Sequence, residues 1–188
     1  MLKFNCYFPR IFWKLNKINY GKNPRIIGWP FVFRYPTAAI TIGDDFSLNS
    51  NFFSNLLGLY QRSIIIARGN GEIVIGKHVG ISGSTLYARK KIEIGDYTLI
   101  GANCKIIDND FHSLDVEERN CDNMSNLQLK PVYIGKSVFI GCNSIILKGT
   151  TIGNNCVVGA GSVVSGKFPD NCVIGGNPAK IIRTLKKS

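Results

Sequence analysis

The segment Asp108-Asn-Asp-Phe-His112 gathers the side chains with the clearest chemical potential in this chain. Imidazole and carboxylate groups are the ones that proteins most often use for proton transfer near neutral pH. The alternative is that His112 is an ordinary solvated loop residue. The chain has only 2 histidines, so a metal site held by three histidines is excluded and no metal is expected. The other histidine, His78, follows Gly76-Lys77 and is interpreted as a structural residue at a corner.

A six-residue period dominates the stretch from Ile134 to Ser165. Aliphatic residues recur at every sixth position, with a small side chain four places after most of them: Ile134, Ile140, Ile146, Ile152, Val158, Val164; Val138, Ser144, Thr150, Cys156, Ser162. Neither a helix nor an ordinary strand pair has this period. It is typical of a triangular parallel β-helix in which each hexad forms one side of a coil. Coils of this kind stack at about 4.8 Å, the spacing between strands.

The same repeat predicts a long loop next to His112. Strict spacing holds at Ile94, Ile100 and Ile106, but 28 residues separate Ile106 from Ile134. This number is not a multiple of six, so residues 107–131 must leave the coil. A loop of this length inside a compact domain is usually functional.

The C-terminal motifs make the resemblance specific. Gly159-Ala-Gly-Ser-Val-Val164, then Gly176-Asn-Pro-Ala-Lys180 and Arg183, resemble the end of the hexapeptide-repeat acyltransferases, and more narrowly the maltose, galactoside and polysaccharide O-acetyltransferases. The resemblance covers about residues 36–185. It implies a left-handed β-helix, a homotrimer and acetyl-CoA as the acyl donor. The repeat alone would also fit a solenoid without enzymatic activity.

The resemblance implies roles for the loop and for the corner at Cys142. A D-x-D-x-H-like segment of the family carries the catalytic histidine, and His112 stands at that place. It would act as general base, with Asp108 or Asp110 orienting the ring. A backbone N–H at Cys142 would bind the oxyanion and the thioester. An acyl-enzyme on Cys142 is disfavoured, because the family transfers the acyl group directly and no base is marked beside this cysteine.

The acyl donor and the acceptor have candidate residues of their own. By resemblance, Ala160, Gly161 and Ser165 meet the pantetheine arm, and the cations expected at the phosphates are Lys167, Lys180, Arg183. The candidates for acceptor binding are Ser82, Ser84, Tyr87, Asn103. Each of these four is equally plausible as corner or ladder structure.

Charge is unevenly distributed along the chain. The net charge is +11, and residues 1–35 carry seven basic and no acidic side chains. This pattern favours local anionic partners over a nucleic-acid binder. Residues 8–18 are expected to form a short amphipathic helix. It either caps the open end of the solenoid, with Phe12 and Trp13 buried, or contacts a membrane surface weakly through Arg10, Lys14, Lys17, Phe12, Trp13.

Cysteines and hydropathy indicate the compartment. The 6 cysteines form no C-x-x-C pair, and Cys104 and Cys156 fall at small-residue positions of the repeat, as compact apolar fillers. No stretch approaches 18 continuous apolar residues, the length that spans a bilayer, and no secretory signature is recognised. We therefore expect a reducing cytoplasm, with the inner face of the membrane as the place of any lipid contact.

The prediction is an all-β, left-handed parallel β-helix of hexapeptide repeats with one long loop and a short C-terminal element. A cap segment, 1–35, precedes the acyltransferase domain, 36–188, which includes the loop 107–131 and the tail 166–188. The expected activity is acetyl transfer from acetyl-CoA to a sugar hydroxyl, in surface polysaccharide synthesis. The alternatives are an N-acetyltransferase on an amino sugar nucleotide, a drug acetyltransferase and a non-catalytic assembly module. A serine acetyltransferase is disfavoured, because it needs a longer helical N-terminal region.

Overall fold

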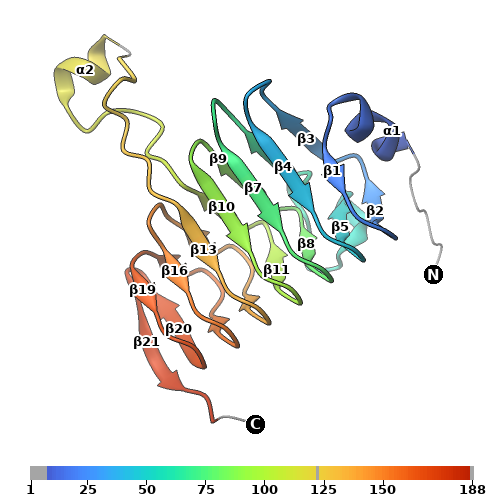
Figure 1. Cartoon of the computed structure of the whole chain (residues 1–188). Coiled ribbons are helices and arrows are strands. Elements are labelled where there is room, and N and C mark those ends of the chain that lie inside the picture. Colours follow the sequence, from blue (N-terminus) through green and yellow to red (C-terminus); the bar gives the residue numbers. More distant parts are fainter. Residues whose placement is uncertain (1–7, 122, 187–188) are drawn as a thin grey trace.

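The chain winds into the triangular solenoid that the hexads predict (Figure 1). The computed structural model describes residues 8–121 and 123–186. Three parallel sheets form its faces and run the length of the molecule. Face 1 contains β1 (Asn19–Tyr20), β4 (Ala39–Ile42), β7 (Glu72–Ile75), β10 (Lys91–Ile94), β13 (Val132–Ile134), β16 (Thr151–Ile152) and β19 (Lys167–Phe168). The handedness is left-handed, as the resemblance implies.

The other two faces complete each coil. Face 2 contains β2 (Arg25–Gly28), β5 (Ser47–Ser50), β8 (Gly80–Ser82), β11 (Leu99–Ala102), β14 (Phe139–Ile140), β17 (Val157–Val158), β20 (Cys172–Gly176) and β21 (Ala179–Thr184). Face 3 contains β3 (Phe31–Arg34), β6 (Ile64–Ala67), β9 (Thr85–Ala88), β12 (Lys105–Ile107), β15 (Ile145–Ile146) and β18 (Val163–Val164). Only β21 runs antiparallel to its neighbour.

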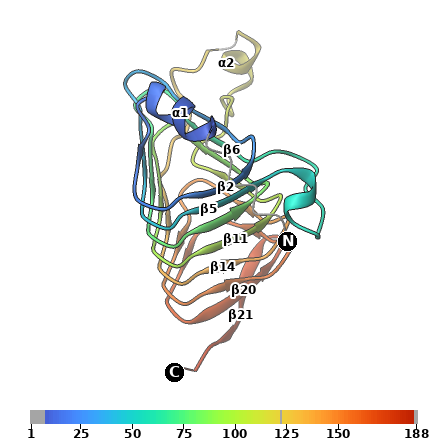
Figure 2. The same ribbon diagram turned by 90° about the vertical axis from the view of Figure 1, so that its right-hand side faces the viewer.

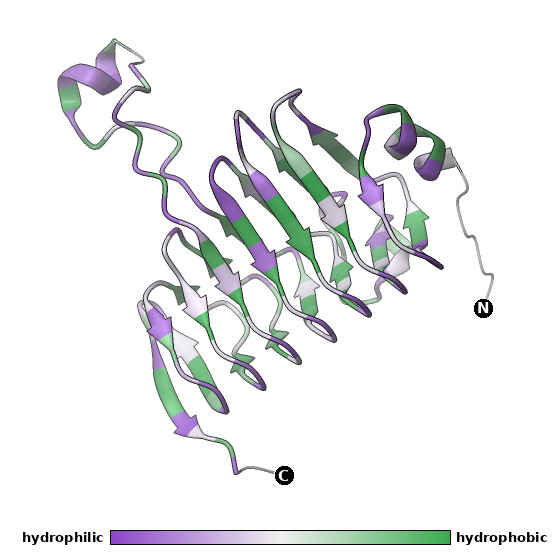
Figure 3. Cartoon of the chain, in the orientation of Figure 1, coloured by the Kyte–Doolittle hydropathy of each residue, from purple (hydrophilic) through white to green (hydrophobic). Residues whose placement is uncertain are grey.

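The six-residue period places equivalent side chains on top of one another. Ile134 pairs with Ile152, and Ile146 pairs with Val164, in the register of successive coils. All four are buried in one continuous core, and Figure 3 shows the resulting alternation of apolar and polar positions along the strands. Corner glycines allow close stacking, since a Cβ on Gly135 would lie 2.7 Å from the carbonyl carbon of Gly153 in the next coil.

The small residues of the repeat are buried behind the corners. The Ser144 hydroxyl donates to the Gly141 carbonyl at 2.8 Å, which satisfies a polar group inside the core. Cys104 and Cys156 are also buried, as expected of apolar fillers. Burial raises the pKa of the Cys104 thiol above its usual value.

The solenoid is longer at both ends than the sequence predicted. Strands β1, β2 and β3 form a first coil from residues 19–34, which pairs with β4, β5 and β6. These residues had been assigned to a separate cap segment. At the other end, β19 and β20 continue the coil beyond Ser165, where a turn was expected. The short closing element is β21, which follows a cis Asn177–Pro178 peptide bond.

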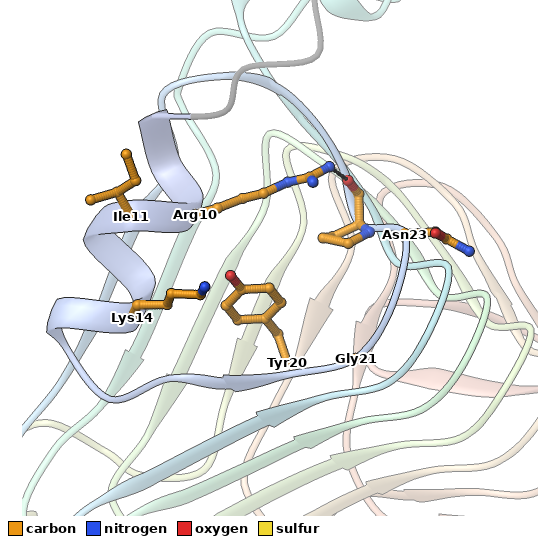
Figure 4. Close-up of a pocket in the computed structure, with 7 residues that line it drawn as sticks. Arg10, Ile11, Lys14, Tyr20, Gly21 and Asn23 are labelled. Carbon is orange, nitrogen blue, oxygen red and sulfur yellow. Dashed lines mark hydrogen bonds between the residues drawn. The ribbon is translucent and has the colours of Figure 1, made fainter.

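Helix α1 (Phe8–Leu15) covers the N-terminal end of the solenoid, the end that faces the viewer in Figure 2. Trp13 is buried against the first coil and meets the Tyr20 ring edge-on at 5.7 Å. The Arg10 guanidinium donates to the Pro24 carbonyl, and Lys14 points toward Tyr20 (Figure 4). Trp13 is therefore a cap residue and is not available to a membrane. Phe12, which the cap interpretation also expected to be buried, is exposed.

Two loops leave the coils. The predicted loop runs from the end of β12 to the start of β13 and contains α2 (Val116–Asn120); it projects far from the body in Figure 1. A second loop, residues 51–63, joins β5 to β6 and contains the 3-10 helix η1 (Phe52–Ser54). The sequence analysis predicted only one long loop.

Candidate active site

Asp108 fixes the start of the 107–131 loop. Its carboxylate is fully buried and accepts hydrogen bonds from the backbone N–H groups of Arg89, Lys90 and Lys91, at 2.7–3.0 Å. The Asn109 side chain donates to it as well, at 3.1 Å. A carboxylate with this set of donors anchors one coil to the next. The structure therefore corrects the proposed pairing of Asp108 with His112, and Asp110 remains the candidate.

Asp110 lies in a cleft where the loop meets face 3. Its carboxylate is 2.7 Å from the Lys148 ammonium, and each side chain is less than a quarter exposed. The cleft has a volume of about 260 Å³, and its lining residues are Ile107, Asn109, Asp110, Phe111, Leu147, Lys148, Ser165. Because both charges are partly desolvated, this ion pair is stronger than one on an open surface.

His112 stands at the edge of this cleft and is exposed. Its backbone N–H donates to the Asp110 carbonyl at 2.8 Å, in a tight turn. The residue in between, Phe111, has a φ of 65° and packs its ring on Tyr87, with 4.8 Å between the ring centroids. A non-glycine residue in this conformation is held there by its surroundings. The turn thus presents the imidazole to the outside of the solenoid.

Cys142 occupies the corner between faces 2 and 3. It is partly exposed, and its carbonyl accepts the Gly161 N–H at 2.9 Å from the next coil. Ala160 and Gly161 are exposed at the same corner. A Cβ on Gly141 would lie 2.5 Å from the Ala160 nitrogen, so the two corners stack closely. Cys142, Ala160 and Gly161 therefore form one continuous column.

One chain does not bring His112 and Cys142 together. Strands β12 and β15 are paired with Ile106 opposite Ile146; Cys142 precedes this pair along face 3, and His112 follows it. About five strand residues at about 3.3 Å each, or about 16 Å, separate the two corners. The candidate base and the candidate oxyanion donor lie at opposite edges of the same face.

The candidate residues for acyl-CoA fall into two groups for the same reason. Lys180 and Arg183 are exposed on β21, in register with Gly175 and Val173 of face 2. Ser165, by contrast, lines the cleft at Asp110, and Lys167 begins β19 beyond it. One group shares face 2 and its edge with Cys142, and the other accompanies His112.

Three of the four acceptor candidates have structural partners. The Ser84 hydroxyl is buried; it donates to the carbonyls of Ser82 and Gly101 and accepts the Cys104 N–H. The Ser82 hydroxyl accepts from the Asn49 side chain at 3.0 Å. Asn103 holds the 51–63 loop through the Gly58 carbonyl and the Tyr60 N–H. These contacts favour the ladder interpretation; Tyr87 alone contacts the histidine loop.

Lys148, Phe111 and Leu147 belong to the site but were missed from sequence. The signal was available in the repeat, since Leu147 is the outward neighbour of buried Ile146, and Lys148 sits at the corner below Asp108. His78 is confirmed at a corner, where it stacks on Tyr97 at 4.7 Å. Within residues 8–121 and 123–186, no group of three His, Cys, Asp or Glu side chains could hold a metal ion.

The fold and this loop define a left-handed β-helix of the transferase type, and comparison with known proteins agrees. Residues 131–166 match the family "Bacterial transferase hexapeptide (six repeats)". The chain is 34% identical to the putative lipopolysaccharide biosynthesis O-acetyl transferase WbbJ of Escherichia coli K12, over 86% of this chain and 80% of that protein. The chain therefore belongs to the hexapeptide-repeat transferase family.

Solved structures extend the comparison. The hexapeptide-repeat acetyltransferase VCA0836 of Vibrio cholerae, solved with acetyl-CoA, is 35% identical with a TM-score of 0.55, covering 65% of this chain and 61% of that one. AntD, an N-acyltransferase of Bacillus cereus solved with coenzyme A and an amino sugar nucleotide, has a TM-score of 0.71 over 95% of this chain and 89% of that one. At 23% identity, AntD shows likeness of fold alone.

Proposed function

We propose that this protein is an O-acetyltransferase that moves acetyl from acetyl-CoA to a hydroxyl group of a sugar destined for a surface polysaccharide. The observation that carries the proposal is the exposed His112, held by a tight turn beside the Asp110–Lys148 cleft. The match to WbbJ, a putative lipopolysaccharide O-acetyl transferase, supports the choice of an oxygen acceptor.

The proposed reaction is direct transfer. His112 removes the proton of the acceptor hydroxyl while its oxygen attacks the thioester carbonyl carbon. The tetrahedral oxyanion is bound by the backbone N–H at the Cys142 corner. When the carbon–sulfur bond breaks, the imidazolium returns the proton to the sulfur, so the products are an acetyl ester and free coenzyme A. Asp110 contributes by holding the turn that carries His112.

The residues present fit acetyl-CoA as the donor. Ala160 and Gly161 expose main-chain groups at the Cys142 corner, where an extended pantetheine arm would find hydrogen-bond partners. Lys180 and Arg183 on the adjacent strand are exposed cations suited to the phosphates.

A homotrimer is proposed because one chain separates the two halves of the site. Setting the His112 edge of one subunit against the Cys142 edge of its neighbour would place base and oxyanion donor around one substrate. Face 2 offers an apolar contact surface, since Leu99 and Phe139 are neighbours in register and about half exposed. Light scattering on the purified protein tests this state; a catalytically active monomer would overturn it.

We propose that the enzyme works in the cytoplasm. Five of the cysteines are free thiols, including Cys156 and Cys172, whose sulfur atoms lie 3.5 Å apart in the core. Unlinked thiols suit a reducing compartment. Separately, none of the helices in the described residues is long and apolar enough to cross a membrane.

An N-acetyltransferase acting on an amino sugar nucleotide is the second candidate, because the AntD fold covers nearly the whole chain. One experiment separates the two. The purified protein is incubated with radiolabelled acetyl-CoA and matched hydroxyl and amino sugars, and the product is treated with mild alkali. An ester loses its label and an amide keeps it. A label stable to alkali would overturn the O-acetyltransferase proposal, and no product with any acceptor would favour the non-catalytic module.

A further inference from the structure

The 51–63 loop is a built structure. Leu59 is buried against Gly83 at its base. Asn103, which has a φ of 62°, binds the loop from the next coil through the Gly58 carbonyl and the Tyr60 N–H. At the other end the Asn51 side chain accepts the Phe53 N–H and caps η1. The loop is therefore anchored on both sides, and its tip is held away from the core.

Large apolar side chains cover this tip. Leu56 is 98% exposed and Phe53 is 82% exposed, and Phe52, Leu57 and Tyr60 are exposed as well. Scattered apolar residues are normal on a protein surface, but a contiguous patch marks an interaction site. An anchored loop that exposes five large apolar side chains in nine residues is such a patch.

The tip belongs to a larger surface at the N-terminal end. Exposed Ile11, Phe12 and Leu15 of α1 lie at the same end of the solenoid, which faces the viewer in Figure 2. A small cleft joins the two parts, because Phe12 and Trp29 line it together with Arg62 at the root of the loop. We call this surface, made of α1, the corner at Trp29 and the loop 51–62, the N-terminal apolar surface.

Basic side chains surround this surface. Residues 46–61 carry no charged side chain, and Arg62 follows them directly. The exposed cations of the first coil and α1 are Lys14, Lys17, Lys22, Arg25. Lys105 lies 5.5 Å from the centre of the Tyr60 ring. The acids at this end, Asp44 and Asp45, lie on the corner between faces 1 and 2, where Asp44 accepts the Lys22 N–H.

We propose that the N-terminal apolar surface binds the interface of an anionic lipid membrane, with the tip of the 51–62 loop inserted among the lipids and the surrounding lysines and arginines on their headgroups. An apolar surface ringed by cations is what such an interface recognises. The same cations disfavour a second copy docking by this surface, since like charges would meet. Binding is independent of the proposed acetyl transfer, because it needs neither acetyl-CoA nor an acceptor.

Co-sedimentation with vesicles tests the proposal. The probes are phosphatidylcholine vesicles with and without phosphatidylglycerol, at low and high salt. The wild-type protein should bind only the anionic vesicles, and less at high salt. The double variant Phe53→Ser/Leu56→Ser should bind about tenfold or more weakly. Tyr97→Ser removes an exposed aromatic ring from a corner far from this surface and should bind like the wild type.

Tryptophan fluorescence provides a second readout. Trp29 is exposed and Trp13 is buried, and the chain has no other tryptophan. Anionic vesicles should shift the emission of the wild type to shorter wavelength, and Trp29→Phe should abolish the shift. Absence of wild-type binding at low salt, or equal binding by the double variant, would overturn the proposal. If the double variant instead changes the mass of the oligomer and no vesicles bind, the loop is a subunit contact.

Discussion

The Lys148 ammonium lies 2.7 Å from the Asp110 carboxylate and ties the start of the histidine loop to the coil below it. His112 donates its backbone N–H to the carbonyl of the same Asp110. The ion pair therefore controls the residue on which the His112 turn closes. Displacement of a catalytic group by about 1 Å is enough to slow an enzyme strongly.

Lys148→Met should consequently lower kcat by about tenfold or more, because Asp110 loses its partner inside the cleft and the turn shifts. KM for acetyl-CoA should change less. The matched control is Lys136→Met, which removes an exposed lysine paired with Asp96 at 3.3 Å and should leave kcat unchanged. Equal effects of the two substitutions on steady-state kinetics would show that the Asp110–Lys148 pair does not position the base.

Arg183→Ala should raise KM for acetyl-CoA several-fold while lowering kcat less, since a phosphate contact stabilises ground and transition states alike. Arg183 is exposed on β21 beside face 2, so its loss should not disturb the core. Lys186→Ala, which removes another exposed cation just beyond β21, is the control. An unchanged KM in initial-rate measurements would place Arg183 outside the donor site.

Cys142→Ala should keep kcat within a few-fold of the wild type. The proposed oxyanion donor at this corner is a backbone N–H, which the substitution retains, and direct transfer needs no thiol nucleophile. An acyl-enzyme mechanism predicts the opposite, a loss of about a thousandfold or more. Mass spectrometry of the wild-type protein after mixing with acetyl-CoA checks the same point, because no acetyl adduct should appear on Cys142.

Asp96 should make folding stability depend on pH. The Lys77 N–H, donated to its carboxylate at 2.9 Å, and the Lys136 ammonium lower the pKa of Asp96 from its ordinary value of 3.8. A carboxyl group with a lowered folded-state pKa stabilises the protein above the unfolded pKa, and this stability is lost as pH falls through the folded pKa.

Asp96→Asn keeps an acceptor for the Lys77 N–H, as Asn154 does for the Lys136 N–H in the next coil, but removes the titrating charge. The free energy of unfolding at pH 7 should fall by less than about 1 kcal/mol, because the group is partly exposed. The difference between the two proteins should vanish as the pH is lowered below about 4. Urea titrations over this range check it, and a difference that grows in acid would contradict the assignment.

The repeat predicted the fold because its period is strict where the coils are regular. Ile134 and Ile152 are 18 residues apart and stack directly. Ile152 and Phe168 are only 16 residues apart but still pair, because the corner at Gly166 is shorter. This lost length hid the last coil from the six-residue count. The loop at 51–63 was hidden for a different reason: its tip is apolar and resembles core sequence.

The candidate site was only partly visible in the sequence. Alternation along β12 buries Ile106 and then Asp108, which separates the anchoring carboxylate from Asp110 in the cleft. Lys148 reaches that cleft from a coil 40 residues later in register, and a single repeat unit cannot reveal that contact. The separation of His112 and Cys142 follows from the width of face 3, so it became apparent only when both corners were placed in three dimensions.

The most direct test of the proposed function is the turnover of His112→Ala with acetyl-CoA and the sugar acceptor identified by the alkali assay. kcat should fall by about 100-fold or more, the usual contribution of a general base, while calorimetry shows unchanged binding of acetyl-CoA. His78→Ala, at a corner on the other side of the coil, should retain wild-type kcat. A His112→Ala enzyme that turns over near the wild-type rate would contradict the assignment of His112 as the base.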